Sequence, residues 1–554
     1  MNPNGGLSEQ IANLLLGLLA AALAAGGILW AAAQATARLA GSASPAAGVA
    51  SGTLALLSDP GDPSTAWDTR LPAGLYWGLA AVLVTALAAG CWLLWRAFRF
   101  TAPRRESDPH KLDGLPSGRA AARTSGTKPL VARAHILRPS LTNKKKVTPD
   151  QVGYLVGTVR GKKVWVSVED SVLVLGPPRS GKGMNLVVPM IVEAPGAVVT
   201  TSLFTDNITL TMRQRERRGP VTVFAPSLEH RLPSAMRWSP IRGCEHPDTA
   251  QLRATALAAG TSRGVENASF WRDKTVQALY PMLHAAAISS ATTADFDRWC
   301  SGPALAAEAV TVLRDHPDAV PGWADKLEEI VTSDPRSRDN MWAGVSQATK
   351  ALSNPNVLDA CSPGAREQFD PASFLAESGT LYVVGDDKGV DAPLVAALIE
   401  DIVAAAKQIA NTSPGNRLDP PLLLMLDEVA NIAYLPSLPT MVSAGGGRGV
   451  TTVNVWQSRG QARDRWGADA ERAIWGASTV KLILGGLTDA QDLHDLSTLV
   501  GSRDEHTDTL NWNPDGTRST STSWRDVPTM RSEQIATMPK GVALMVHPGQ
   551  QPAL

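Results

Sequence analysis

The sequence has 554 residues, of which 44% are hydrophobic and 19% are charged. This length exceeds what a single hydrophobic core usually serves, so we expect two or three folded domains. The 52 basic and 52 acidic residues give a formal net charge of zero, which excludes a global attraction to nucleic acid or lipid as an argument about function. Cys91, Cys244, Cys300 and Cys361 lie far apart with no C-x-x-C pair, and we interpret them as reduced thiols outside any disulfide framework or zinc site.

Two long uncharged segments near the N-terminus predict a membrane region over residues 1–98. The first contains LLLGLLAAALAAGGILWAAA, and the second is GLYWGLAAVLVTALAAGCWLLW. Each is long enough as a helix to cross a bilayer, and each has Trp or Tyr near an end, where aromatic rings favour the headgroup zone. We therefore predict a hairpin of two transmembrane helices, at about residues 11–33 and about residues 74–95.

Each of these segments has an alternative explanation. The first could be a cleaved signal peptide, and the second could be a buried core helix. A signal peptide usually begins with positive charge and has a shorter apolar core, whereas Met1 to Gln10 contain no Lys or Arg. Two membrane spans therefore explain these segments better.

Basic residues dominate the segment that follows the second span. From Arg96 to Lys146 there are 13 Lys or Arg residues against three acidic ones. The positive-inside rule places this side in the cytoplasm, which predicts a multi-pass protein of the inner or plasma membrane with its C-terminal bulk cytoplasmic and residues 34–73 outside. Residues 99–150 show little periodicity and are predicted to be a basic linker. Anionic headgroups explain its charge, and contact with nucleic acid is the alternative.

Beyond residue 150, short apolar strands alternate with helices. This alternation predicts a parallel sheet covered by helices on both faces. Residues from about 244 to about 370 show only helical spacing, so we expect an all-α domain inserted into an α/β nucleotide-binding domain of residues 151–243 and 371–554. The predicted strands are two runs in GYLVGTVRGKKVWVSV, then SVLVLG, GAVVTT, PVTVFAP, GTLYVVG, LLLMLD, GVTTVNVW, STVKLILGG and VALMV.

The segment GPPRSGKG joins a buried strand to a helix and is nearly a phosphate-binding loop. Its backbone N–H groups can point at phosphates, the helix N-terminus adds a positive dipole end, and the lysine can reach the β- and γ-phosphates. The usual Ser or Thr after the lysine is replaced by glycine. An ordinary tight turn is the alternative, but the strand, the lysine and the helix together favour nucleotide binding. The predicted binding residues are Gly176, Pro177, Pro178, Arg179, Ser180, Gly181, Lys182 and Gly183.

A nucleoside triphosphatase also needs acidic residues at the end of a second apolar strand. In PPLLLMLDEVANI, Asp427 ends the strand and Glu428 follows it. We predict that Asp427 holds Mg²⁺, directly or through water, and that Glu428 orients and polarises the attacking water. Solvated acids at a strand end are the alternative, and the presence of the glycine loop favours the catalytic interpretation.

The segment SAGGGRGVTTVNVWQS contains two further candidates. Gln457 follows a predicted buried strand, a position from which its side chain can sense the γ-phosphate or hold the nucleophilic water. Arg448 stands in a glycine-rich turn, from which it could reach a neighbouring subunit's nucleotide as an arginine finger. The alternative for Arg448 is an ordinary surface arginine of a loop.

These motifs together resemble the type IV coupling proteins of the TraG/TraD class, the membrane ATPases of conjugation and related secretion systems. The resemblance rests on the two N-terminal segments, GPPRSGKG, the helical insertion, LDEVANIAYLPSLPTMVSAGGGRG and the downstream WQS. It implies a RecA-like P-loop domain that forms a hexamer around a channel and uses ATP and Mg²⁺. It also implies that the chain recruits a relaxase with single-stranded DNA, or a protein, and drives it through a type IV secretion channel. The insertion is implied to contact substrate.

The resemblance implies roles for four residues. Lys182 would be the phosphate lysine, Asp427 and Glu428 the metal-binding and catalytic acids, and Gln457 the sensor. Two positions depart from the family pattern: VVTTSLFTDN has no acid before Asp206, and Ala225 stands where relatives often have Asp. A non-translocating ATP-binding membrane receptor or assembly platform is therefore the alternative function. A double-stranded DNA pump fits less well because of the long helical insertion.

Overall fold

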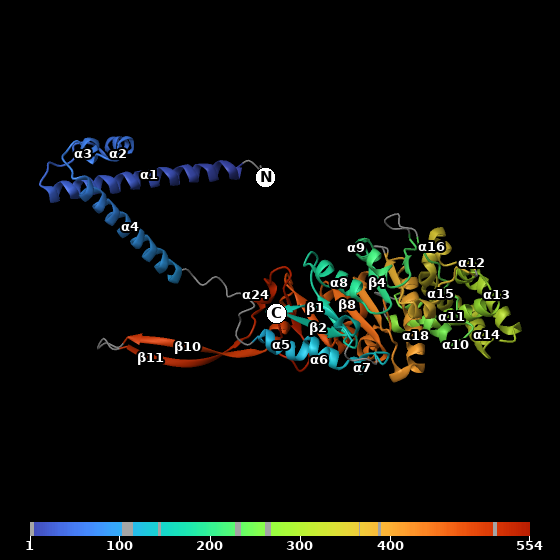
Figure 1. The fold of residues 1–554 in the computed structure, drawn as a ribbon. Coiled ribbons are helices and arrows are strands. Elements are labelled where there is room, and N and C mark those ends of the chain that lie inside the picture. The colour runs from blue at the N-terminus through green and yellow to red at the C-terminus, as the bar shows by residue number, and fades with distance from the viewer. Residues whose placement is uncertain are drawn as a thin grey trace. The chain divides into compact units, whose positions relative to one another are not determined.

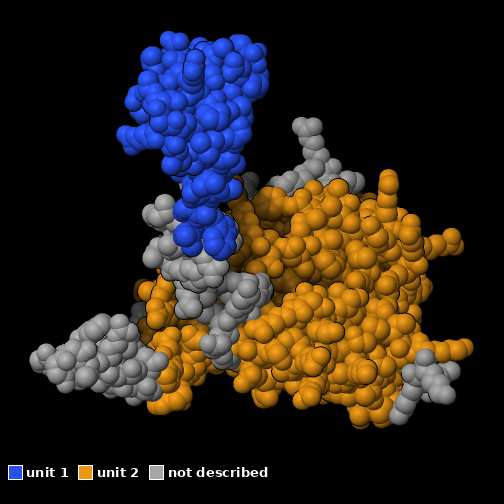
Figure 2. All heavy atoms as spheres, turned by 60° about the vertical axis from the view of Figure 1, so that its left-hand side comes forward, with its two compact units in different colours: residues 1–107 blue, residues 108–554 orange. Residues whose placement is uncertain are grey.

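The structure is a computed structural model that describes residues 5–101, 115–141, 146–227, 234–260, 267–364, 366–385, 389–512 and 518–554. The chain divides into two compact units, Met1–Ser107 and Asp108–Leu554 (Figure 2). The parts of the predicted basic linker at 102–114 and 142–145 lie outside the described residues.

The described residues of the N-terminal unit form four helices: α1 (Gly5–Ala40), α2 (Val49–Ser58), α3 (Pro63–Trp67) and α4 (Ala73–Thr101). The helices α1 and α4 pack together, and Trp67 Nε1 donates a hydrogen bond to the Tyr76 hydroxyl at 3.1 Å. Among the described residues, one helical stretch, Ala73–Gly90, is long and apolar enough to cross a membrane. The two-span hairpin remains a prediction.

Three short helices, α5 (Gly118–Ser125), α6 (Thr127–Ala132) and α7 (Ala134–Leu137), occupy part of the segment that we expected to be a linker. The expectation missed them because each is too short to show periodicity. Leu130, Ala134 and Leu137 are buried, in one hydrophobic cluster with the antiparallel hairpin of β1 (Gly153–Val159) and β2 (Lys162–Ser167). We call residues 118–137 the three-helix segment.

The core of the larger unit is an eight-stranded sheet in the order β12-β9-β3-β8-β7-β4-β6-β5. Its strands β4 and β8 are labelled in Figure 1. Seven strands are parallel, as predicted, whereas β12 pairs antiparallel with β9 at one edge. The strands are β3 (Val172–Leu175), β4 (Val198–Ser202), β5 (Val221–Phe224), β6 (Thr380–Val384), β7 (Leu422–Asp427), β8 (Val450–Trp456), β9 (Val480–Leu484) and β12 (Ala543–Val546).

Both faces of this sheet are buried. Leu173 and Leu175 belong to one hydrophobic cluster, and Val172 and Val174 belong to another, because successive side chains of a strand point to opposite faces. The covering helices are η3 (Gly183–Val187), α8 (Val188–Glu193), α9 (Asp206–Arg215), α17 (Pro371–Ala376), α18 (Ala392–Thr412), α19 (Val429–Ile432), α20 (Leu438–Ala444), η7 (Gly446–Arg448), α21 (Arg459–Trp466), α22 (Ala468–Ala477), α23 (Ala490–Val500) and α24 (Ser532–Ala536).

The described residues between β5 and β6 contain helices and no strand. Buried Arg253 of this block binds Asp401 of α18 at 2.7 Å and stacks over Trp238, which joins the insertion to the sheet domain. The insertion helices are α10 (Pro247–Ala258), α11 (Ala268–Ile288), α12 (Thr293–Cys300), α13 (Pro303–Asp315), α14 (Trp323–Thr332), α15 (Pro335–Thr349) and α16 (Pro355–Ala360).

A long hairpin of β10 (Ser502–Trp512) and β11 (Arg518–Pro528) forms a separate two-stranded sheet that projects from the body of the larger unit (Figure 1). We did not predict it. Its sequence is rich in Ser, Thr and Asp and lacks the apolar alternation by which half-buried strands are recognised.

Candidate functional site at the carboxyl edge of the sheet

The glycine-rich loop follows β3 at the carboxyl edge of the sheet. The Gly176 N–H donates to the Trp456 carbonyl oxygen at 3.0 Å, which fixes the start of the loop beside the end of β8. Arg179 and Gly181 have φ values of 63° and 92°, so the backbone turns sharply before the helix begins. A Cβ added at Gly176 would lie 2.7 Å from Leu484 Cδ1, so this position has no room for a side chain. The loop and the helical turns of η3 and α8 form the strand–loop–helix arrangement that phosphate binding requires.

Asp427 ends β7, the second parallel strand from β3 in the sheet, at the same edge as the glycine loop. Its carboxylate is buried, with 8% of the residue exposed, and its backbone carbonyl accepts a hydrogen bond from Thr201 Oγ1 at 2.7 Å. Burial raises the pKa of Asp427 to about 6, nearby Lys182 opposes this increase, and Glu428 adds to it. The lysine of the loop is therefore close enough to Asp427 to affect its charge.

Glu428 and Gln457 also meet at this edge. Glu428 has a left-handed backbone with φ of 53°, which a residue other than glycine adopts only when its surroundings hold it there. Gln457 Nε2 lies 3.4 Å from Glu428 Oε1, within hydrogen-bond distance. The structure therefore brings together Lys182, Asp427, Glu428 and Gln457 from three separate parts of the sequence.

The carboxylates at this edge can accommodate a divalent cation. Among the described residues, Asp427 Oδ1 and Glu428 Oε2 are buried oxygens without a hydrogen-bond partner. Mg²⁺ prefers oxygen ligands and usually keeps several waters besides one or two carboxylates and phosphate oxygens. No group of three or more metal-binding side chains occurs in the described part of the chain, so a cation here would need phosphate or water as further ligands.

The helix behind Gln457 is held by contacts that we did not predict. Arg459, in the first turn of α21, binds the buried Glu471 at 2.7 Å and Asp495 at 3.2 Å, and its guanidinium stacks over Trp475 at 4.4 Å. These partners lie on α22 and α23, so no local sequence pattern connects them with Gln457.

A hydrogen bond between two amide side chains also joins the elements that follow Glu428 and Gln457. Gln461 Nε2 donates to Asn431 Oδ1 at 2.5 Å, which links α21 to the turn after Glu428. Glu428 and Gln457 both precede the helices that carry Asn431 and Gln461, so helical spacing gives no sequence signal for this pair.

Arg448 lies away from the other predicted residues. It precedes β8, whereas Gln457 follows β8, so the two lie at opposite edges of the sheet. Gly449 and the seven residues of β8 lie between them, and β8 alone spans about 23 Å. Arg448 is exposed, and its guanidinium has no hydrogen-bond or ion-pair partner among the described residues. It cannot reach the glycine loop of its own chain.

Comparison with known proteins gives a family match at the C-terminal part. Residues 421–540 match the family model described as the TraM recognition site of TraD and TraG. The conjugal transfer protein TraG of Agrobacterium fabrum is 25% identical over 217 residues, which cover 39% of this chain and 30% of that protein. TraG of Rhizobium radiobacter is 26% identical over 217 residues, which cover 39% of this chain and 31% of that protein. The match therefore spans less than a third of the length of these curated relatives.

Solved structures of the bacterial conjugative coupling protein TrwB share the fold. An unbound form has a TM-score of 0.55 at 18% identity, covering 75% of this chain and 90% of TrwB. A form with sulphate has a TM-score of 0.56 at 16% identity, covering 79% of this chain and 91% of TrwB. Other TrwB structures hold the ATP analogue ADPNP, or ADP and Mg²⁺. The predicted resemblance to TraG/TraD-type coupling proteins is confirmed.

Proposed function

We propose that this TraG/TraD-like chain is a membrane ATPase that recruits a substrate for conjugation or type IV secretion and drives its transfer. The observation that carries the proposal is the convergence of Lys182, Asp427, Glu428 and Gln457 at one edge of the sheet. A phosphate-binding loop, the buried Asp427, the half-buried Glu428 and an amide next to Glu428 are the groups that phosphoryl transfer to water uses.

The roles of the residues follow from their positions. The loop residues 176–183 would bind the phosphates of ATP, with Lys182 supplying a positive charge. Asp427 would hold Mg²⁺, which neutralises phosphate charge when bound. The Glu428 carboxylate would orient and polarise the attacking water, and Gln457 would fix the position of that carboxylate through the contact at 3.4 Å.

The rest of the chain fits a motor at a membrane. Helix α4 would cross the membrane, and α1 would form the second span of the hairpin, with the larger unit in the cytoplasm. Six copies around a channel would place the exposed Arg448 of one copy near the nucleotide of the next. The transported substrate would be single-stranded DNA with its relaxase, or a protein, and the partners would be secretion-channel components. TrwB structures that contain ADPNP, or ADP and Mg²⁺, support the nucleotide part of this proposal.

The test uses the full chain reconstituted in lipid vesicles. Phosphate release is measured with and without single-stranded DNA, and double-stranded DNA of equal mass is the control. A motor for single-stranded DNA predicts that single strands increase turnover several-fold more than duplex does. ATP binding without phosphate release under any of these conditions would instead support the non-translocating receptor.

A further inference from the structure

A chain of contacts connects the turn that carries Arg448 to the three-helix segment. The turn consists of Gly445 to Gly449 and lies at the amino edge of the sheet. The Arg448 carbonyl oxygen accepts a hydrogen bond from the Leu418 N–H at 2.9 Å. Arg417 NH1 donates to the Gly446 carbonyl oxygen at 3.4 Å. The segment 417–418 therefore holds the backbone of the turn on both sides of Gly447.

Glu169 holds the same turn in place. A Cβ added at Gly446 would overlap the Glu169 carbonyl oxygen, so the two backbones are in close contact. Glu169 Oε1 also binds Arg417 NH2 at 2.5 Å. Only 10% of the Arg417 side chain is exposed. An arginine this buried is costly to leave unpaired, so its carboxylate partner keeps Arg417 on the turn.

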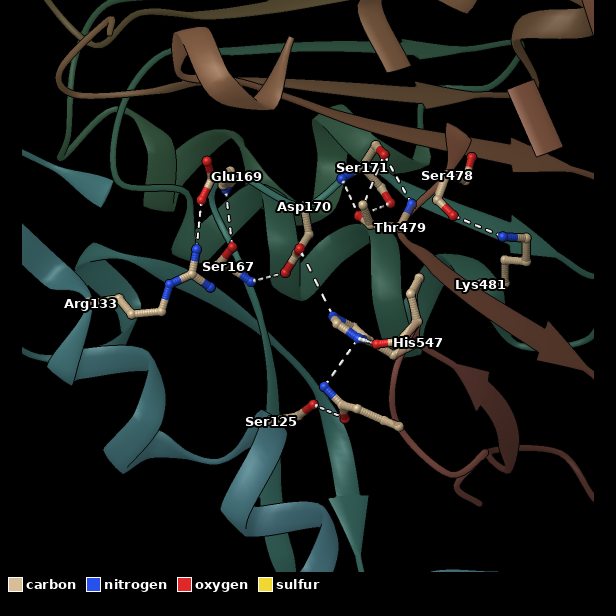
Figure 3. A network of polar contacts seen from close by, with 12 residues as sticks. Ser125, Arg133, Ser167, Glu169, Asp170, Ser171, Ser478, Thr479, Lys481 and His547 are labelled. Carbon is tan, nitrogen blue, oxygen red and sulfur yellow. Dashed lines mark hydrogen bonds and ion pairs between the residues drawn. The ribbon is translucent and has the colours of Figure 1, made fainter. Parts of the chain in front are cut away.

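The other oxygen of Glu169 faces the three-helix segment. Arg133, between α6 and α7, donates to Glu169 Oε2 at 2.7 Å (Figure 3). A second link runs nearby, where Arg138 binds Asp419 at 2.7 Å and the Ser140 N–H donates to the same carboxylate at 2.8 Å. Asp419 follows Arg417 and Leu418 directly. Two ion pairs thus join Glu169, which contacts the turn, and Asp419, which follows Leu418, to Arg133 of the three-helix segment and to Arg138 directly after it.

We infer that Glu169 and Arg417 are positioning residues that fix the Arg448 turn, and that Arg133 couples this turn to the three-helix segment. The inference rests on the proposed function, because it assumes that Arg448 completes the nucleotide site of a neighbouring copy. Arg448 itself is exposed and unpartnered among the described residues, so its own contacts cannot determine where it points. The direction of the Arg448 side chain therefore depends on the backbone of the turn, and Glu169 and Arg417 both contact that backbone at Gly446.

The main test is a double-mutant cycle in the full chain, with phosphate release as the measurement. Arg448→Ala is expected to lower turnover at least about 30-fold, because an arginine finger contributes orders of magnitude to phosphoryl transfer. Glu169→Gln is expected to lower turnover about tenfold, since small displacements of a catalytic group are costly. The double variant should match Arg448→Ala alone within about twofold, because Glu169 acts only through Arg448.

Mixtures of two variants show whether Arg448 acts on the nucleotide site of a neighbouring copy. Lys182→Ala copies, which lack a working loop but keep Arg448, are mixed with Arg448→Ala copies, which keep the loop. The mixture should regain turnover if Arg448 acts on a neighbour, and Glu169→Gln placed in the Lys182→Ala copies should reduce this regained turnover. Glu308→Gln is the matched control, because it breaks an exposed ion pair with Arg298 in the insertion. This control should change nothing.

Several outcomes would overturn the inference. It fails if Glu169→Gln leaves turnover unchanged. It also fails if turnover of the double variant is lowered by the product of the two single reductions, because Glu169 and Arg448 would then act independently. If Glu169→Gln does not fold, Arg417→Lys and Arg133→Met replace it, and both should keep the thermal midpoint while lowering turnover. Unchanged turnover in these two variants would contradict the inference. If Arg448→Ala releases phosphate at the wild-type rate, Arg448 is not an arginine finger and the inference about its positioning fails. The proposed motor function fails only if Lys182→Ala also releases phosphate at the wild-type rate.

Discussion

Gln457 Nε2 lies 3.4 Å from Glu428 Oε1, although 28 residues of sequence separate the two. Parallel strands β7 and β8 are neighbours, so residues that follow their carboxyl ends meet at one edge of the sheet. The amide is a donor and the carboxylate an acceptor, and the contact leaves the other carboxylate oxygen free of partners among the described residues. This pairing joins the residue that follows β8 to the carboxylate that we propose activates water.

The first prediction concerns the chemical step. Glu428→Gln keeps the shape of the side chain but removes the negative charge that polarises water, so turnover should fall at least about 100-fold. Gln457→Ala should lower turnover less, by about tenfold, because the carboxylate remains but loses an orienting contact. Fluorescent nucleotide titration should show little change in affinity for either variant. A large loss of affinity in Glu428→Gln would contradict the assigned role.

The second prediction concerns magnesium and pH. Burial raises the pKa of Asp427 to about 6, so below that pH the side chain is largely protonated and cannot serve as an anionic ligand. The affinity of the nucleotide-loaded protein for Mg²⁺ should therefore fall as the pH is lowered from 7 to 5. Calorimetric titration measures it, and Asp427→Asn should remove most of this pH dependence. If the affinity of Asp427→Asn for Mg²⁺ falls equally as the pH is lowered, a group other than Asp427 is titrating.

The third prediction follows from the same pKa. A carboxyl whose folded pKa lies above its unfolded value binds more protons in the folded state, so its contribution to stability falls as the pH rises through 6. Asp427→Asn should therefore raise the free energy of unfolding at pH 8, without nucleotide or Mg²⁺, by about 3 kcal/mol. The gain should vanish near pH 4. Thermal unfolding at both pH values checks this, and a variant that is less stable than the wild type at pH 8 contradicts it.

The fourth prediction concerns the support behind Gln457. Arg459→Met would leave the buried Glu471 without its closest cationic partner, a change that typically costs about 3 to 5 kcal/mol. The midpoint of thermal unfolding should fall clearly. Arg298→Met, which breaks the exposed pair with Glu308, is the matched control and should leave the midpoint almost unchanged. Equal effects of the two changes would show that burial of the Arg459 pair is not what matters.

The parts of the fold that follow local patterns could be predicted from the sequence. Buried strands such as Leu422–Asp427 appear in the sequence as short apolar runs. The inserted block is recognised as helical because its apolar residues recur at helical spacing. The antiparallel pairing of β12 could not be predicted, because strand direction depends on the chain path between strands. The β10–β11 hairpin was missed because its polar residues give no alternating pattern.

The candidate site shows the same division. Lys182, Asp427, Glu428 and Gln457 stand in motifs whose spacing fixes their place at strand ends, so the sequence predicts their meeting. Their assignment to catalysis stays a prediction. The supporting contacts depend on packing between distant elements, such as the pairing of Arg459 with residues of α22 and α23. The link from Arg133 through Glu169 to Arg417 joins three separate parts of the chain, and no local motif indicates it.

The most direct test of the central claim is phosphate release from ATP by the full chain in lipid, compared with Lys182→Ala and Glu428→Gln. We predict steady release by the wild type, loss of nucleotide binding in Lys182→Ala, and binding without release in Glu428→Gln. Release by the wild type that is no faster than release by both variants, with and without single-stranded DNA, would contradict ATP hydrolysis at this site.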